Sequence, residues 1–146
     1  MLKGSIDSEI NDIEIKIGTN GYITEKYIPQ PEVRLTLYKK ISSIKKLEDL
    51  SEIKKELEDR FGSMPKETTD LLTLTQVRIL SSKLSINRIS SNKEKISLFL
   101  DENNLLTPPN SKIEKIMINL PESVIDKVDF LLNKLKSFHE QLQKAS

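Results

Sequence analysis

Carboxylates stand close together in one charged stretch of this 146-residue chain, in three pairs: Glu48 with Glu52, Glu52 with Glu56, and Glu58 with Asp59. Two carboxylates can act as acid and base, as in glycosidases, when a cleft holds both and separates their pKa values. Here lysines and Arg60 interleave with the acids at helical spacing, which is typical of solvated i, i+4 ion pairs. The stretch therefore predicts a charged helix surface, and a hydrolase built on Glu52, Glu56 or Glu58 has only proximity in its favour.

The chain lacks the residues that other catalytic and cofactor chemistries require. The chain has no cysteine, which excludes disulfides, thiolate zinc, iron–sulfur clusters and cysteine nucleophiles. None of its four glycines opens a phosphate-binding loop, so the chain has no motif for ATP chemistry. The single histidine, His139, has no second metal ligand or triad partner at a characteristic spacing, and we expect it partly exposed near a helix end. We expect no catalytic residue, no cofactor and no metal.

Charge balance and hydropathy exclude further classes of protein. The chain has 23 Lys and Arg residues against 22 Asp and Glu residues, without the basic excess of a dedicated nucleic-acid binder. Its densest basic patch, Lys39, Lys40, Lys45 and Lys46, has only Tyr38 as a nearby aromatic residue. No apolar run approaches the roughly 20 residues that cross a bilayer, and no signal segment opens the chain. We expect a cytoplasmic protein without a membrane partner.

Hydrophobic spacing places the charged stretch on the second of three consecutive helices. Three isoleucines alternate with polar residues over 13–17, which predicts an N-terminal strand. A first helix is expected over 31–44, because proline suits its opening position. The second is expected over 47–61 and ends at Gly62, which supplies the left-handed conformation that other residues resist. The third is expected over about 66–84.

After residue 85 the apolar pattern changes from helical to alternating. Residues 86–89 and 95–100 flank a polar turn, which predicts a hairpin. Residues 115–120 alternate again and predict a fourth strand, although a helix beginning within Ser111–Met117 is the alternative. The last helix is expected to open at Pro121, near a cap at Asn119 or Leu120. Its apolar residues follow a heptad seam that Ile125 and Leu132 widen: Val124, Val128, Leu131, Leu135, Phe138 and Leu142.

These elements predict an α+β fold. The small β-sheet would contain the N-terminal strand, the hairpin and one further strand, packed by three consecutive helices and a long C-terminal helix. Residues 1–12 are interpreted as a lead-in from a domain boundary, and 13–146 as a single domain. The heptad seam spans fewer than three heptads, so we expect it to pack inside the domain. A free-standing adaptor that docks or dimerises through this helix is the alternative.

Two segments carry a family resemblance. Residues 27–41, YIPQPEVRLTLYKKI, resemble the Y-I-P-x-x-x-x-R-L-x-x-Y-K-R-I segment in the C-terminal domain of the bacterial transcription-repair coupling factor (Mfd, TRCF). Residues 56–65, ELEDRFGSMP, are similar to that domain's E-L-x-D-R-F-G-x-x-P. Order and spacing agree over roughly 13–89. Between 93 and 146 no diagnostic residue is recognised.

The resemblance implies a regulatory, non-enzymatic domain of an ATP-dependent DNA translocase that pushes stalled RNA polymerase and recruits UvrA. In that family the domain packs against the N-terminal UvrB-like module of the same protein, masks the UvrA-binding surface and restrains the motor. UvrA, RNA polymerase and DNA would be reached only through the full-length protein. The isolated domain is expected to be monomeric.

The resemblance also assigns interface residues. Glu56 and Asp59 of the E-L-x-D-R-F-G block would face basic residues of the UvrB-like module, with Glu52 and Arg60 at the periphery. Helical spacing independently places the pair away from the apolar stripe, where two carboxylates suit an arginine. The assignment requires both side chains to be exposed and not already held by the chain's own lysines. Arg60 could instead be a local partner of Glu56, and Arg34 is expected to tie helix ends together.

Overall fold

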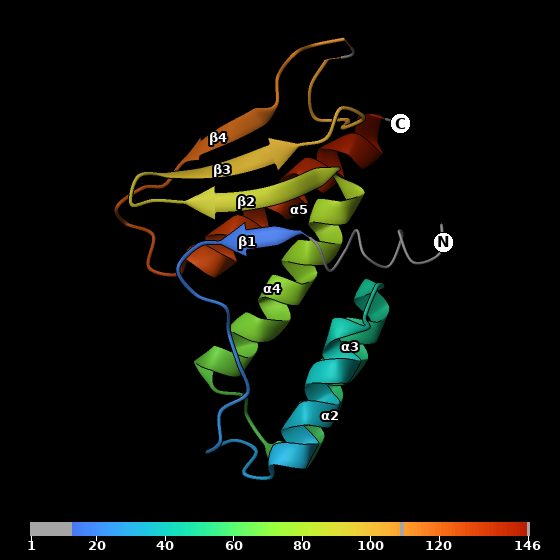
Figure 1. Ribbon diagram of the computed structural model, residues 1–146, viewed down its shortest axis with the longest axis vertical. Helices are drawn as coiled ribbons and strands as arrows, with labels where there is room; N and C mark the ends of the chain where they lie inside the picture. The colour runs from blue at the N-terminus through green and yellow to red at the C-terminus, as the bar shows by residue number, and fades with distance from the viewer. Residues whose placement is uncertain (1–12, 109, 146) are drawn as a thin grey trace. The chain divides into compact units, whose positions relative to one another are not determined.

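The computed structural model describes residues 13–108 and 110–145, so the expected lead-in over 1–12 lies outside the described residues. The described residues form one strand, three helices, three strands and a last helix, in that order (Figure 1): β1 (Glu14–Lys16), α2 (Pro31–Ser42), α3 (Leu47–Phe61), α4 (Lys66–Lys83), β2 (Ile86–Ser91), β3 (Lys95–Leu100), β4 (Lys115–Asn119) and α5 (Lys127–Ala145). The α+β fold class is confirmed. The described residues divide into two compact units, a helical unit (20–79) and a sheet unit (13–19 with 80–145).

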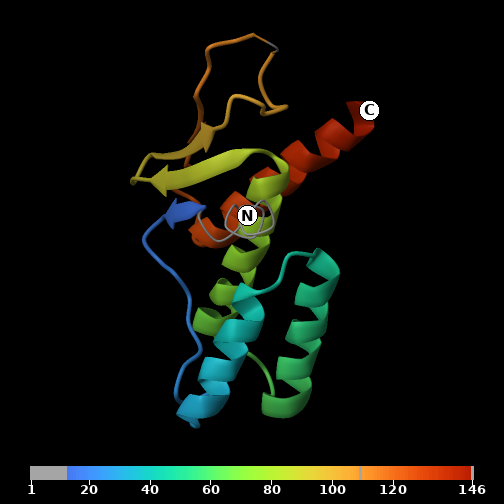
Figure 2. The same cartoon turned by 45° about the vertical axis from the view of Figure 1, so that its right-hand side comes forward.

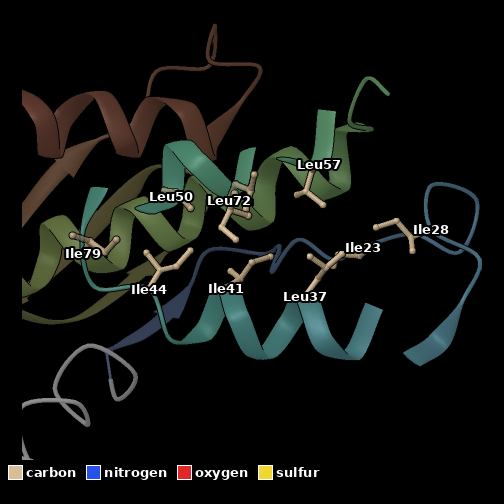
Figure 3. Packing of buried hydrophobic residues seen from close by; sticks show 10 residues of the cluster. Ile23, Ile28, Leu37, Ile41, Ile44, Leu50, Leu57, Leu72 and Ile79 are labelled. Carbon is tan, nitrogen blue, oxygen red and sulfur yellow. The ribbon is translucent and has the colours of Figure 1, made fainter. Parts of the chain in front are cut away.

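The helical unit is built on amphipathic helices whose apolar residues meet in one cluster (Figure 3). Its fully buried members include Ile28, Leu37 and Leu57, and Phe61 packs against the cluster from its edge. Figure 2 shows α3 running back alongside α2. Helix α3 ends where the sequence predicts, because Gly62 adopts φ 86° and its N–H bonds to the Glu58 carbonyl oxygen.

A close backbone approach fastens the segment before α2 to the start of α4. The Tyr22 N–H donates to the Glu67 carbonyl oxygen at 3.0 Å, and the buried Thr68 hydroxyl donates to the Tyr22 carbonyl oxygen at 3.1 Å. At Gly21 (φ 71°) a Cβ atom would overlap the backbone of Leu71. Only glycine fits this contact, because any side chain would collide with the helix backbone.

The sheet unit contains a four-stranded mixed sheet in the order β1-β2-β3-β4 (Figure 1). Strand β1 pairs parallel with β2, and β2, β3 and β4 pair antiparallel. The predicted hairpin is confirmed, and β2 extends two residues further than expected. Residues 115–119 form a strand and Ser111 is in coil, so the helical alternative for Ser111–Met117 is wrong.

The last helix begins later than the sequence predicted. It was expected to open at Pro121, but α5 begins at Lys127 because the Asp126 carboxylate accepts a hydrogen bond from the Asp129 N–H at 3.1 Å. The expected cap at Asn119 or Leu120 is therefore wrong. Ile125, expected to widen the seam, is fully exposed ahead of the helix, and Val124 also precedes it.

The central seam residues pack inside the sheet unit, whereas Phe138 and Leu142 are half-buried. Val128, Leu131 and Leu135 are buried, and Figures 1 and 2 show α5 crossing one face of the sheet. Interior packing over this stretch agrees with the expectation that the seam is core, and it removes the central seam as a docking surface for an adaptor.

Candidate protein-interaction site

Four acidic residues of α3 lie on one side of the helix. The helix buries Leu50, Ile53 and Leu57 toward the core. These four acids follow one another at spacings of three, four and three. Because a helix turns about 100° per residue, they share a side of α3 that faces away from the buried residues. We call them the acidic stripe: Asp49, Glu52, Glu56 and Asp59.

Part of the acidic stripe lines a groove between the end of α2 and α3. The groove has a volume of about 310 Å³. Its lining residues come from both helices: Lys40, Ser43, Ile44, Asp49, Glu52, Ile53 and Glu56. The structure thus brings Glu52 and Glu56 together at one groove, whereas Asp59 lies on the helix beyond it.

Glu56 is already paired within the chain. Its Oε1 atom lies 2.9 Å from Lys40 Nζ, and its Oε2 atom lies 3.0 Å from Arg60 Nη1. Hydrogen bonds from Lys40 first and Arg60 second hold the pKa of Glu56 below its usual range. The predicted interface role required Glu56 to be free of the chain's own lysines, and the ion pair with Lys40 contradicts that requirement. Local sequence spacing could not reveal this ion pair, because Lys40 lies on α2 and reaches Glu56 only where α2 and α3 pack together.

Asp59 and Glu52 have the exposure that an interface requires. Both side chains are exposed, and neither has an ion-pair partner among residues 13–108 and 110–145. Arg60 behaves as the alternative predicted, as the i+4 partner of Glu56, and its guanidinium also lies 4.8 Å from the centre of the Phe61 ring. The accessible carboxylates of the stripe are therefore Asp59 and Glu52.

The two segments that carry the family resemblance meet at the end of α3. The Tyr27 hydroxyl lies 2.8 Å from the Gly62 carbonyl oxygen and 3.1 Å from that of Leu57. Its ring packs edge-on against Phe61, with 5.9 Å between ring centres. Burial first, and the nearby Glu58 carboxylate second, raise the pKa of Tyr27. The Tyr27 hydroxyl thereby donates to the backbone at the point where α3 ends.

Other residues of the first segment also hold the backbone. The Arg34 guanidinium donates to the carbonyl oxygens of Ile28 and Pro29 at 2.7 and 3.0 Å, as its expected structural role requires. The Tyr38 hydroxyl accepts a hydrogen bond from the Ile23 N–H at 2.6 Å. These side chains hold the segment before α2 against α2 itself.

The arrangement offers binding rather than acid–base chemistry. The pKa of Glu56 is lowered, whereas a general acid needs a raised one. Glu58 lies on the opposite side of α3 from Glu56, so these two cannot flank one substrate.

Within the described part of the chain, no group of three or more His, Asp or Glu residues could hold a metal ion. None of the described helices is long and apolar enough to span a bilayer.

Comparison with known proteins agrees with these motifs. Residues 17–111 match the family model of the TRCF domain. The transcription-repair-coupling factor of Borreliella burgdorferi is 31% identical over 122 residues, covering 84% of this chain and 11% of that protein. That of Escherichia coli is 30% identical over 112 residues, covering 73% of this chain and 10% of that protein. The chain spans about a tenth of the length of the curated relatives it matches.

A solved structure shares the fold. The crystal structure of a C-terminal domain of transcription-repair coupling factor aligns with a TM-score of 0.70 and 20% sequence identity, covering 88% of this chain and 94% of that one. The family match extends past the region over which motifs are recognised, into the sheet and the loop before β4. Because the family model covers well over half of its residues, the chain belongs to the TRCF domain family.

Proposed function

We propose that this chain is the regulatory, protein-binding domain of a transcription-repair coupling factor. It packs against the N-terminal UvrB-like module of that protein, covers the surface that UvrA uses, and restrains the motor until RNA polymerase is engaged. The observation that carries the proposal is the exposed pair Asp59 and Glu52, displayed without an ion-pair partner among the described residues on a helix that the family motifs fix in place.

The remaining member of the predicted pair, Glu56, takes a modified role. Its partners Lys40 and Arg60 are both 53% exposed, so solvent screens the ion pairs and they stabilise little. A basic side chain of the UvrB-like module can then share the Glu56 carboxylate with Lys40 or displace it. Asp59 is the principal contact, with Glu52 and Arg60 at the periphery.

An interface made of exposed charges suits a contact that must open. Rim charges contribute chiefly to the association rate and to specificity, and salt largely screens exposed charges that are more than about 8–10 Å apart. The UvrB-like module should therefore bind this chain more weakly as salt rises. A domain that masks a surface only until the motor is engaged needs that reversibility.

The test uses Asp59→Ala combined with Glu52→Ala and calorimetric titration of the 146-residue chain with the UvrB-like module. We expect binding to weaken by about 1–3 kcal/mol, the scale for leaving charged hydrogen bonds unpaired. Glu58→Ala is the matched control, because it removes an exposed acid from another side of the same helix. Its affinity should equal that of the unmodified chain.

Competition then tests masking. UvrA added to a pull-down of this chain with the UvrB-like module should reduce the captured module. Unchanged affinity in the Asp59 and Glu52 variant would remove the acidic stripe from the interface. Simultaneous binding of UvrA and this chain would contradict masking even if the stripe does bind.

A further inference from the structure

The face of the sheet opposite α5 carries cations in register. The strand residues that point away from the buried isoleucines and leucines include four basic side chains from four different strands, all exposed: Lys16, Arg88, Lys95 and Lys115. Phe99, half-buried, stands among them near the end of β3. We call these five residues the cationic face. They belong to the sheet unit, whereas the acidic stripe belongs to the helical unit.

Strand pairing brings three of these residues into one row. Arg88 on β2 pairs with Phe99 on β3, and Phe99 pairs with Lys115 on β4. A register shift between Ile86 and Arg88 sets this alignment, because the extra residue Asn87 lets Arg88 stand opposite the ring. Neighbouring strands lie about 4.8 Å apart, so the backbones of Arg88 and Lys115 are about 10 Å apart.

The aromatic ring holds both cations. The Arg88 guanidinium carbon lies 4.7 Å from the centre of the Phe99 ring, and Lys115 Nζ lies 5.6 Å from it. Contacts at these distances are cation–π interactions. They restrict two long side chains without neutralising them, so an anion that binds there meets charges whose positions are already limited.

The charge on this face is not cancelled by acids of the same rows. Glu14, beside Arg88 on β1, is the carboxylate of these rows, and Lys16 holds it at 2.7 Å. Hydrogen bonding to Lys16 first, with a smaller contribution from Arg88, lowers the pKa of Glu14, so it stays ionised. The second row adds hydroxyls, Ser90 and Ser97, and the apolar Met117. Four cations thus face one acid, although the whole chain has a net charge of only +1.

We propose that the cationic face binds single-stranded nucleic acid through its phosphates. Surfaces that bind single strands without sequence preference combine a track of basic side chains with aromatic rings among them. Lys16, Arg88, Lys95 and Lys115 are the phosphate contacts, with Arg88 able to donate two parallel hydrogen bonds. Phe99 keeps two of these cations in place.

An acidic peptide is the competing ligand for the same charges. A peptide carboxylate is recognised best by a pocket that presents paired donors, whereas these cations are spread along an open sheet surface with a ring at its centre. A continuous chain of phosphates matches that spread, because each cation can meet a different phosphate. The arrangement therefore favours nucleic acid.

The test is fluorescence anisotropy of a labelled 20-nucleotide single-stranded DNA of mixed sequence with the 146-residue chain. Three to four phosphate contacts predict that affinity falls at least about tenfold between 50 and 150 mM salt. Arg88→Gln with Lys115→Gln should weaken binding about tenfold at 50 mM salt and flatten the salt dependence. Phe99→Leu should weaken it about fivefold through the lost ring.

The matched control is Lys54→Gln with Lys55→Gln, which removes two exposed lysines from α3 in the helical unit and should change affinity by less than about twofold. Circular dichroism spectra matching that of the unmodified chain establish that each variant is folded. Binding that is absent at 50 mM salt, or equal in the Arg88 and Lys115 variant and the control, overturns the proposal. Competition by a 20-residue polyglutamate as effective as unlabelled DNA would overturn it in favour of an acidic peptide.

Discussion

The helical unit and the sheet unit are held together by different kinds of contact. In the helical unit, single side chains join backbone segments far apart in sequence, as Tyr27 joins Gly62, Thr68 joins Tyr22 and Tyr38 joins Ile23. In the sheet unit, strand pairing and the alternation of apolar residues carry the architecture. The first kind of contact needs one particular residue type, whereas the second accepts many.

This difference explains where the family resemblance can be recognised. Tyrosine at 27 and arginine at 34 each make a contact that a similar residue would lose, and glycine at 62 adopts a positive φ that other residues resist. Such positions form a motif with fixed spacing. A strand such as β3 needs only that alternate positions be apolar, and isoleucine, leucine or valine meets that need equally. No diagnostic residue is therefore expected after residue 93, although the fold continues there.

The variant expected to have the largest effect, and so the first test of this comparison, is Gly21→Ala. A Cβ atom there would overlap the Leu71 backbone nitrogen and lie 2.6 Å from its Cα, in addition to the strain of φ 71°. We expect a loss of about 2–5 kcal/mol in the free energy of unfolding, since overpacking adds to backbone strain. Urea denaturation followed by circular dichroism measures it.

Gly62→Ala is the matched control for the close approach. Gly62 has a similar φ of 86°, but nothing lies within 4 Å of the position that its Cβ atom would take. Strain alone predicts a loss of about 1–2 kcal/mol. Equal losses in the two variants would show that backbone strain alone accounts for the effect, and that the contact with α4 contributes nothing.

Much of the fold was predictable because periodicity is a local property of the sequence. Helix α3 ends at Phe61, where glycine follows, and β3 matches its predicted bounds. The start of α5 was wrong because proline at 121 and a carboxylate cap at Asp126 are both valid opening signals, and the hydrogen bond to Asp129 decided between them. Sequence spacing cannot weigh two such signals.

The candidate site was less predictable than the fold. Spacing correctly placed Asp59 and Glu52 on the exposed side of α3, and it offered Arg60 as a partner for Glu56. It gave no sign of Lys40, because an ion pair between residues sixteen apart depends on how two helices pack. The cationic face was hidden for the same reason, since its rows exist only through strand register.

A smaller effect is expected in the sheet unit from Asp126→Ala. It removes the side-chain acceptor that caps α5, and caps of this kind contribute about 0.5–2 kcal/mol. Asp126→Asn retains an acceptor oxygen and should keep most of that stability in urea denaturation. If Asn destabilises as much as Ala, the negative charge near the helix N-terminus matters more than the capping hydrogen bond. In that case this contact would not depend on one particular hydrogen bond. It would then resemble the other contacts of the sheet unit, which accept many residue types.

The smallest effect is expected from Glu56→Gln, and it bears directly on the proposed interface. The pKa of Glu56 is lowered in the folded chain by Lys40 and Arg60, so the pair stabilises the fold above the unfolded pKa of about 4.3. That contribution is lost as pH falls through the lowered folded value. Exposed pairs contribute about 0–1 kcal/mol, and we expect a difference in this range at pH 7 that shrinks as the pH is lowered and in high salt.

Glu52→Gln is the control, because Glu52 is an exposed acid of the same helix and lacks an ion pair among the described residues. Urea denaturation at pH 7 and pH 3 compares the two variants. A Glu56→Gln difference well above 1 kcal/mol would mean that Lys40 holds the carboxylate too firmly to be shared with a partner. Asp59 would then have to act without it, whereas a small, salt-sensitive difference leaves Glu56 able to exchange Lys40 for a basic residue of the UvrB-like module.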